Sequence, residues 1–141
     1  MENTQQIQTY LKRIEGVYKA ILKDQARCGE ELAKLFDEKI SATPAFTAPV
    51  RMNADSLAYF AEELSDEGAP SGNEEVTQEI LAFRTYLLQE VVPTLHDIAD
   101  DADEDETTHE GEVLAEFLEV LGDQQMSAHV ATLERLFEKY L

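Results

Sequence analysis

Apolar side chains recur through the first third of the chain at alternating intervals of four and three residues. This heptad spacing puts them on one face of a helix. Flanking apolar residues widen the face, which favours packing against several neighbours over a two-stranded coil. We therefore expect one long N-terminal helix. The face consists of Ile7, Leu11, Ile14, Tyr18, Ile21, Gln25, Cys28, Leu32 and Leu35.

The pattern breaks at SATPAFTAPV, residues 41–50. Pro44 and Pro49 lack amide donors and push the residues before them toward extended geometry, so we expect the first helix to stop here. Asn53 then stands where it can cap a second, short helix over about 53–66.

A Gly-, Pro- and Ser-containing loop is expected at residues 66–73. Helical spacing resumes over residues 76–98, and Pro93 inside that pattern should bend the helix. Two more apolar stripes follow over residues 113–121 and 126–141, displaced in phase from each other. They predict two short helices or one bent helix.

The phase changes at Gly122, which suits a helix end, and Asp123, which suits a new N-cap. We find no strand-like alternation and no internal repeat. The sequence therefore predicts a single domain over residues 1–141 with an all-α fold, an antiparallel bundle of four to five helices with a long N-terminal helix.

Charge is the next constraint, because the formal net charge of −19 is spread unevenly. Residues 1–51 carry eight Lys or Arg against seven Asp or Glu, whereas residues 52–141 carry three against twenty-three. Such a field repels the phosphates of nucleic acids and anionic membranes, and it attracts basic proteins. We expect no direct nucleic-acid binding and no membrane binding.

The sequence contains no residue pattern that is typical of a catalytic site. Cys28 is the only cysteine and lies on the apolar face, where burial keeps a thiol unreactive. No phosphate-binding glycine loop, nucleophile elbow or dinucleotide fingerprint occurs. We expect no enzyme activity and no cofactor. The single cysteine and the absence of a targeting pattern at the N-terminus predict a cytoplasmic protein.

The stretch DIADDADEDETTHEGE, residues 97–112, holds nine carboxylates and no Lys or Arg. Four of them match the first, third, fifth and twelfth ligands of a calcium-binding EF-hand loop. The sixth position, which needs glycine, holds Glu106, and no sister loop exists. We therefore predict a solvated acidic loop without a metal. The four matching residues are Asp101, Asp103, Asp105 and Glu112.

The histidines do not form a metal or phosphorelay motif. His96, His109 and His129 are far apart, and only His109 has a glutamate three positions earlier, Glu106, whereas a bundle metal site needs such a pair on each of two helices. Around His96 the acidic neighbours would oppose a phosphoryl group. A small metal-binding or phosphorelay-type bundle remains an alternative, as does an adaptor whose charge serves only solubility.

The charge itself suggests a function, since −20 over ninety residues exceeds what a small domain needs for solubility. We predict an acidic, non-enzymatic interaction protein that antagonises or escorts a basic protein partner, as an immunity protein or inhibitor does, and that could mimic nucleic acid. A homodimer through the first helix is a separate hypothesis. The predicted partner-binding residues are Asp100, Asp101, Asp103, Asp105, Glu106, Glu62, Glu63 and Glu67.

Overall fold

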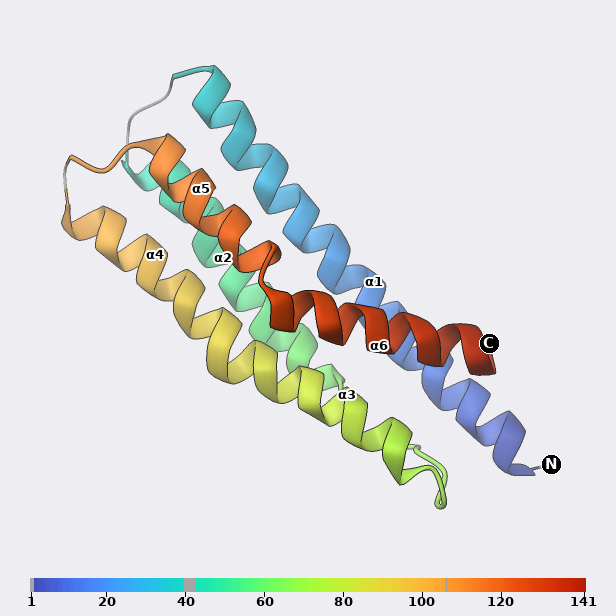
Figure 1. The fold of residues 1–141 in the computed structure, drawn as a ribbon. Coiled ribbons are helices and arrows are strands. Elements are labelled where there is room, and N and C mark those ends of the chain that lie inside the picture. The colour runs from blue at the N-terminus through green and yellow to red at the C-terminus, as the bar shows by residue number, and fades with distance from the viewer. Residues whose placement is uncertain (1, 40–42, 106) are drawn as a thin grey trace.

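Four helical columns lie side by side and alternate in direction in the computed structural model, which describes residues 2–39, 43–105 and 107–141 (Figure 1). The third column is one helix interrupted by a π-helical turn, and the fourth is divided into two helices. The described residues contain no strand, and the all-α antiparallel bundle predicted from the sequence is confirmed. In chain order the elements are α1 (Glu2–Asp37), α2 (Thr43–Glu63), α3 (Glu74–Tyr86), η1 (Leu87–Val91), α4 (Val92–Glu104), α5 (Glu110–Leu121) and α6 (Gln124–Tyr140).

The apolar face of α1 forms one side of the core, as the heptad spacing predicted. Eight of its nine members are buried, and only Leu35 is half-buried. This face packs against α2, α5 and α6. A homodimer through the first helix stays a prediction, and it would have to use other residues, because the heptad face is already covered within the chain.

The start of α2 differs from the sequence-based expectation. The helix begins at Thr43, ten residues before Asn53, and Pro49 lies inside it. The prediction that Asn53 caps the helix is wrong, since Asn53 is fully buried in mid-helix. Phe46 and Val50 explain the difference, because both are fully buried and their core packing outweighs the backbone hydrogen bond that Pro49 cannot donate.

Pro93 was predicted to bend the helix, and the irregularity that the structure has near it is η1, the π-helical turn that ends two residues before Pro93. A π turn inserts one extra residue, so the amide of Val92 bonds to the carbonyl of Leu87, five residues back. Pro93 has no amide hydrogen to donate, which favours such an irregular turn at this place.

The acidic stretch is more ordered than predicted, because α4 continues to Glu104. Asp101 and Asp103 are therefore helical residues, and the prediction that they belong to a solvated loop is wrong. A helix cannot wrap these side chains around an ion as an EF-hand loop does. The connection that does follow is short, since α5 begins at Glu110.

The division of the fourth column confirms the break predicted at Gly122 and Asp123. Gly122 ends α5, and the carboxylate of Asp123 caps α6 by accepting a hydrogen bond from the amide of Gln125 at 2.8 Å. α6 then diverges from the direction of α5 and ends beside the N-terminal part of α1 (Figure 1). None of the described helices has the length and apolar character needed to cross a membrane.

Candidate functional site: an acidic groove between α4 and α5

Two rows of carboxylates face each other where α4 and α5 lie side by side. Each row has members at positions i, i+4 and i+7, the spacing that keeps side chains on one helical face. Like charges at such spacing cost an isolated helix about 0.2–0.5 kcal/mol per pair, so these rows form against local preference. The α4 row is Asp97, Asp101 and Glu104, and the α5 row is Glu112, Glu116 and Glu119.

The space between the rows is an open groove made of two adjoining hollows, with volumes of about 450 and 400 Å³. Ile98, Asp101 and Glu116 line both hollows, which makes them continuous. Along the third column the groove runs from Tyr86 to Glu104, eighteen residues, or about 27 Å. Its length suits a segment of polypeptide better than a single ion.

We call this surface the acidic groove. Nine carboxylates line it, and none of the Lys or Arg residues in the described chain does. Apolar side chains, including Val91, Ile98 and Val120, line it as well. The groove therefore combines apolar contact surface with dense negative charge. Its carboxylates are Glu90, Asp97, Asp101, Glu104, Asp105, Glu112, Glu116, Glu119 and Asp123.

The surroundings of Glu116 change the pKa of its carboxyl group. Partial burial raises the pKa of its carboxyl group above the ordinary value, and the negative charges of Asp101, Glu112 and Glu119 raise it further. Asp101 acts from the opposite side of the groove, and the other two act from α5 itself. Burial and the neighbouring negative charges thus both oppose ionisation of Glu116.

Two of the partner-binding residues predicted from the sequence form ion pairs within the chain instead. Asp100 and Asp103 both pair with Arg51 of α2, Asp100 at 2.8 Å, on the side of α4 that faces α2. Asp103 also accepts a hydrogen bond from Thr47 at 3.1 Å. These contacts tie the end of α4 to the beginning of α2 and leave both carboxylates outside the acidic groove.

Three other predicted residues, Glu62, Glu63 and Glu67, lie at the opposite end of the bundle. They are exposed where α2 ends, whereas α2 begins beside the end of α4 (Figure 1). The guanidinium of Arg13 satisfies the backbone there, donating to the carbonyl of Glu63 at 2.6 Å and to that of Glu67 at 3.0 Å. These residues cannot form one site with those of α4.

The sequence therefore identified the charged region but not the face that forms the site. Of the eight predicted residues, Asp101 and Asp105 line the acidic groove, and Glu106 lies outside the described residues. Seven lining carboxylates were missed. The i, i+4, i+7 spacing of carboxylates within 97–104 and within 112–119 is the signal that could have found six of the nine.

The lysines of α1 are well separated from this surface. They point away from the core, because their positions lie on the helical face opposite the buried one. α1 packs against α2, α5 and α6, while α4 occupies the far side of the bundle. The negative charge of the groove is therefore not neutralised by the first helix. The exposed lysines on this face are Lys12, Lys19, Lys23 and Lys34.

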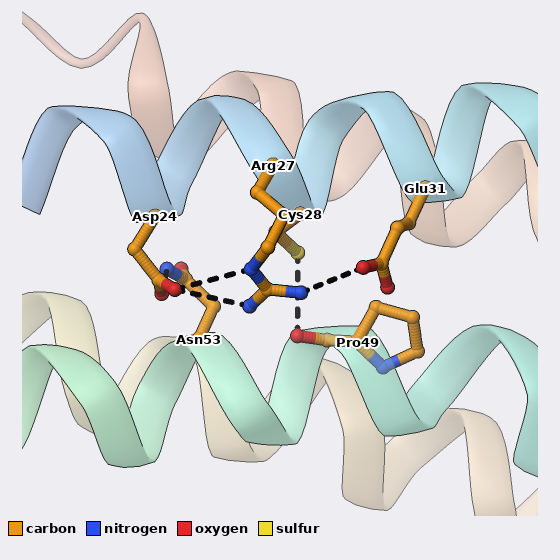
Figure 2. A network of polar contacts seen from close by, with 6 residues as sticks. All are labelled: Asp24, Arg27, Cys28, Glu31, Pro49 and Asn53. Atoms are coloured by element: carbon orange, nitrogen blue, oxygen red, sulfur yellow. Dashed lines mark hydrogen bonds and ion pairs between the residues drawn. The ribbon is translucent and has the colours of Figure 1, made fainter.

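A second polar cluster joins α1 to α2 (Figure 2), with Asn53 and Cys28 fully buried and Glu31 partly exposed. Arg27 bridges Asp24 and Glu31 along α1, with distances of 3.1 and 2.8 Å. Asn53 of α2 donates to Asp24 at 2.7 Å, and Cys28 donates to the carbonyl of Pro49 at 3.4 Å. These contacts are internal to the chain and tie α1 to α2, which is typical of a structural junction rather than a binding site.

Metal binding finds no support in the geometry. Within the described ranges, no three or more His, Cys, Asp or Glu side chains converge in a way that could hold an ion. His96 lies near Asp55, at 3.8 Å, and His129 packs against aromatic rings of α3.

Comparison with models of known families, with curated proteins and with solved structures finds no match to this chain. The acidic groove thus stands on its own geometry.

Proposed function

We propose that this chain binds a basic protein partner in the acidic groove, as an inhibitor, immunity protein or escort does. The observation that carries the proposal is the lining of the groove, nine carboxylates and no cation among the described residues. A complementary charge pattern steers a basic partner to this face and speeds association. The partner's own nucleic-acid site would supply such a pattern, with the carboxylates standing in for phosphates.

The placement of the chain's own cations supports a directed surface. Arg51 neutralises Asp100 and Asp103 on the α2 side of α4, and the lysines of α1 point away from the bundle. If the charge served solubility alone, cations and anions would be expected to interleave over the exterior. Here nine carboxylates line one groove, and none of the described Lys or Arg residues lines it.

The electrostatic repulsion among the groove carboxylates also supports binding of a basic partner. Like charges repel along each row and across the groove, and after partial burial this repulsion is the second cause of the raised pKa of Glu116. A basic side chain placed between the rows would relieve it. The groove also offers apolar surface from Val91, Ile98 and Val120, which a partner can bury on binding.

The test compares two variants with the same change of net charge. Asp101→Asn, Glu112→Gln and Glu116→Gln together neutralise the groove, whereas Glu62→Gln, Glu63→Gln and Glu67→Gln together neutralise the end of α2. The probe is a fluorescent synthetic helix of about fourteen residues, with lysines flanking a leucine stripe. Anisotropy measures its affinity at about 0.15 M salt.

We expect the groove variant to bind the probe at least about tenfold more weakly than the wild type, and the control variant to bind within about twofold of it. Circular dichroism confirms that both variants keep their helical content. Equal losses in the two variants would contradict the proposal, because binding would then follow net charge alone. No binding by the wild type would also contradict it and would favour charge that serves solubility.

A further inference from the structure

His129 joins α6 to α3 through two aromatic rings. Its ring centroid lies 5.6 Å from that of Phe83 and 5.1 Å from that of Tyr86. Phe83 is fully buried, and His129 itself is half-buried beneath α6. An ionisable side chain thus packs between α6 and α3, at a position where an apolar side chain could make the same packing contacts.

α6, like α5, has few buried side chains for its length. Of its seventeen residues only Met126, Leu133 and Phe137 are buried, and it is separated from α5 by the break at Gly122 and Asp123. Few apolar contacts and a break in the backbone hydrogen bonding are the features of a segment that opens before the rest of the fold.

Two phenol groups also hold α6. Tyr86 of α3 donates to Asp123 at 3.1 Å, and Tyr18 of α1 donates to Glu134 at 2.7 Å. Burial, aided by the hydrogen bond to Asp123, raises the pKa of Tyr86 to about 12, so this phenol keeps its proton at neutral and acidic pH. Both contacts persist while the histidine titrates.

The surroundings of His129 disfavour a proton on its ring. Burial lowers the pKa of the imidazole below its ordinary value, and the negative charge of Glu79 on α3 opposes this effect without overcoming it. The other titratable groups around the same hollow are Tyr86 from α3 and Glu90 from η1. A ring that is easier to protonate in the open than in the closed state favours opening as the pH falls.

We propose that His129 is an acid-responsive latch, and that a proton on its ring loosens α6 from α3 by rotation at the Gly122–Asp123 junction. Tyr86, Asp123 and Gln125 also line one end of the acidic groove. Opening of α6 therefore changes the end of the groove as well. This inference goes beyond the proposed function, and its test needs no partner.

The experiment is hydrogen exchange followed by NMR at about pH 7.5 and about pH 5, a window that spans histidine titration and lies above the usual range of carboxyl groups. Protection factors, which remove the intrinsic effect of pH on exchange, are compared for α6 and α2. The same samples give the pKa of His129 from its ring protons. The wild type is compared with His129→Phe, which keeps an aromatic ring, and with His96→Gln as a control.

We expect protection of α6 amides in the wild type and in His96→Gln to fall several-fold at the lower pH, with α2 unchanged. In His129→Phe the protection of α6 should not depend on pH. The pKa of His129 should be lower in the folded chain than in urea. Aromatic faces also attract cations, so a pKa above the urea value would overturn the proposal. Protection of α6 that ignores pH in the wild type would overturn it too, even if His129→Phe does not fold.

Discussion

Asn53 and Asp24 join α2 to α1 by a hydrogen bond inside the bundle, from the amide nitrogen of Asn53 to one carboxylate oxygen at 2.7 Å (Figure 2). Arg27 donates to the other oxygen of Asp24 at 3.1 and 3.2 Å. Asn53 is fully buried, and its own side-chain oxygen has no hydrogen-bond partner. A shift of α2 along α1 would leave the buried amide of Asn53 without its partner and remove one hydrogen bond from Asp24, so the pair fixes the relative position of the two helices.

The substitution Asn53→Asp should therefore be strongly destabilising at neutral pH. It places a second carboxylate against Asp24 at a fully buried position, and we expect a loss of about 3–5 kcal/mol in the free energy of unfolding. Burial raises the pKa of the new carboxyl group above its unfolded value, so stability should recover as the pH falls toward that raised pKa. Urea unfolding at about pH 7 and pH 5 measures both effects.

Asn53→Ala is the matched control for that prediction. It removes the donor without adding a charge, and the expected loss is about 1–3 kcal/mol with a weaker dependence on pH. A stability of Asn53→Asp within about 1 kcal/mol of the wild type at neutral pH would show that water reaches this interface, and the register argument would fail.

Cys28 should be almost unreactive in the folded chain. Burial raises the pKa of its thiol from 9.0 to about 12, against the weaker opposing effect of Arg27. Three pKa units reduce the reactive thiolate about a thousandfold at neutral pH, before any steric protection. Alkylation by iodoacetamide should be at least that much slower in the native protein than in urea. A native rate within about tenfold of the unfolded rate would contradict the buried position.

Arg13 should stabilise the end of α2 through the shape of its guanidinium, and not only through its charge. It donates to the backbone carbonyls of Glu63, Ser65 and Glu67, which no single ammonium can reach together. We expect Arg13→Met to lose about 1–2 kcal/mol of stability, and Arg13→Lys to lose most of the same amount. Urea unfolding, with Lys12→Gln as a surface control, separates this result from a simple charge effect, for which Arg13→Lys would match the wild type.

The helices could be predicted because their apolar spacing is regular. The face of α1 and the break between Gly122 and Asp123 are properties of local sequence, and both were found. The beginning of α2 was missed because Pro49 and Asn53 are local signals of a break and a cap. Tertiary packing of Phe46 and Val50, together with the partner Asp24, overrides those signals.

The site was harder to predict, because a carboxylate in the sequence does not reveal what faces it. Asp100 and Asp101 are neighbours in the chain, yet one pairs with Arg51 and the other lines the acidic groove. Only the rotation of α4 in the bundle separates them. Density of charge along the chain indicates the region that contains the acidic groove, while helical periodicity of charge would have been needed to choose the face.

Glu116 provides the last prediction, which concerns the electrostatic cost of the groove. Partial burial and then Asp101, Glu112 and Glu119 raise the pKa of its carboxyl group. Because the folded pKa lies above the unfolded one, the folded state binds more protons, and the group destabilises the fold as the pH rises through this range. Glu116→Gln should therefore be more stable than the wild type at neutral pH, by about 0.5 kcal/mol or less, since solvent screens a largely exposed carboxylate.

The gain from Glu116→Gln should disappear near about pH 4, where the wild-type carboxyl group is protonated, and it should shrink in about 1 M salt. Thermal unfolding at the two pH values and two salt concentrations checks the prediction against Glu62→Gln, which makes the same charge change outside the groove. If both variants gained equally, the stabilisation would reflect the total charge of −19. A gain confined to Glu116→Gln would instead assign the repulsion to the facing rows of α4 and α5, the same rows that a basic partner would neutralise.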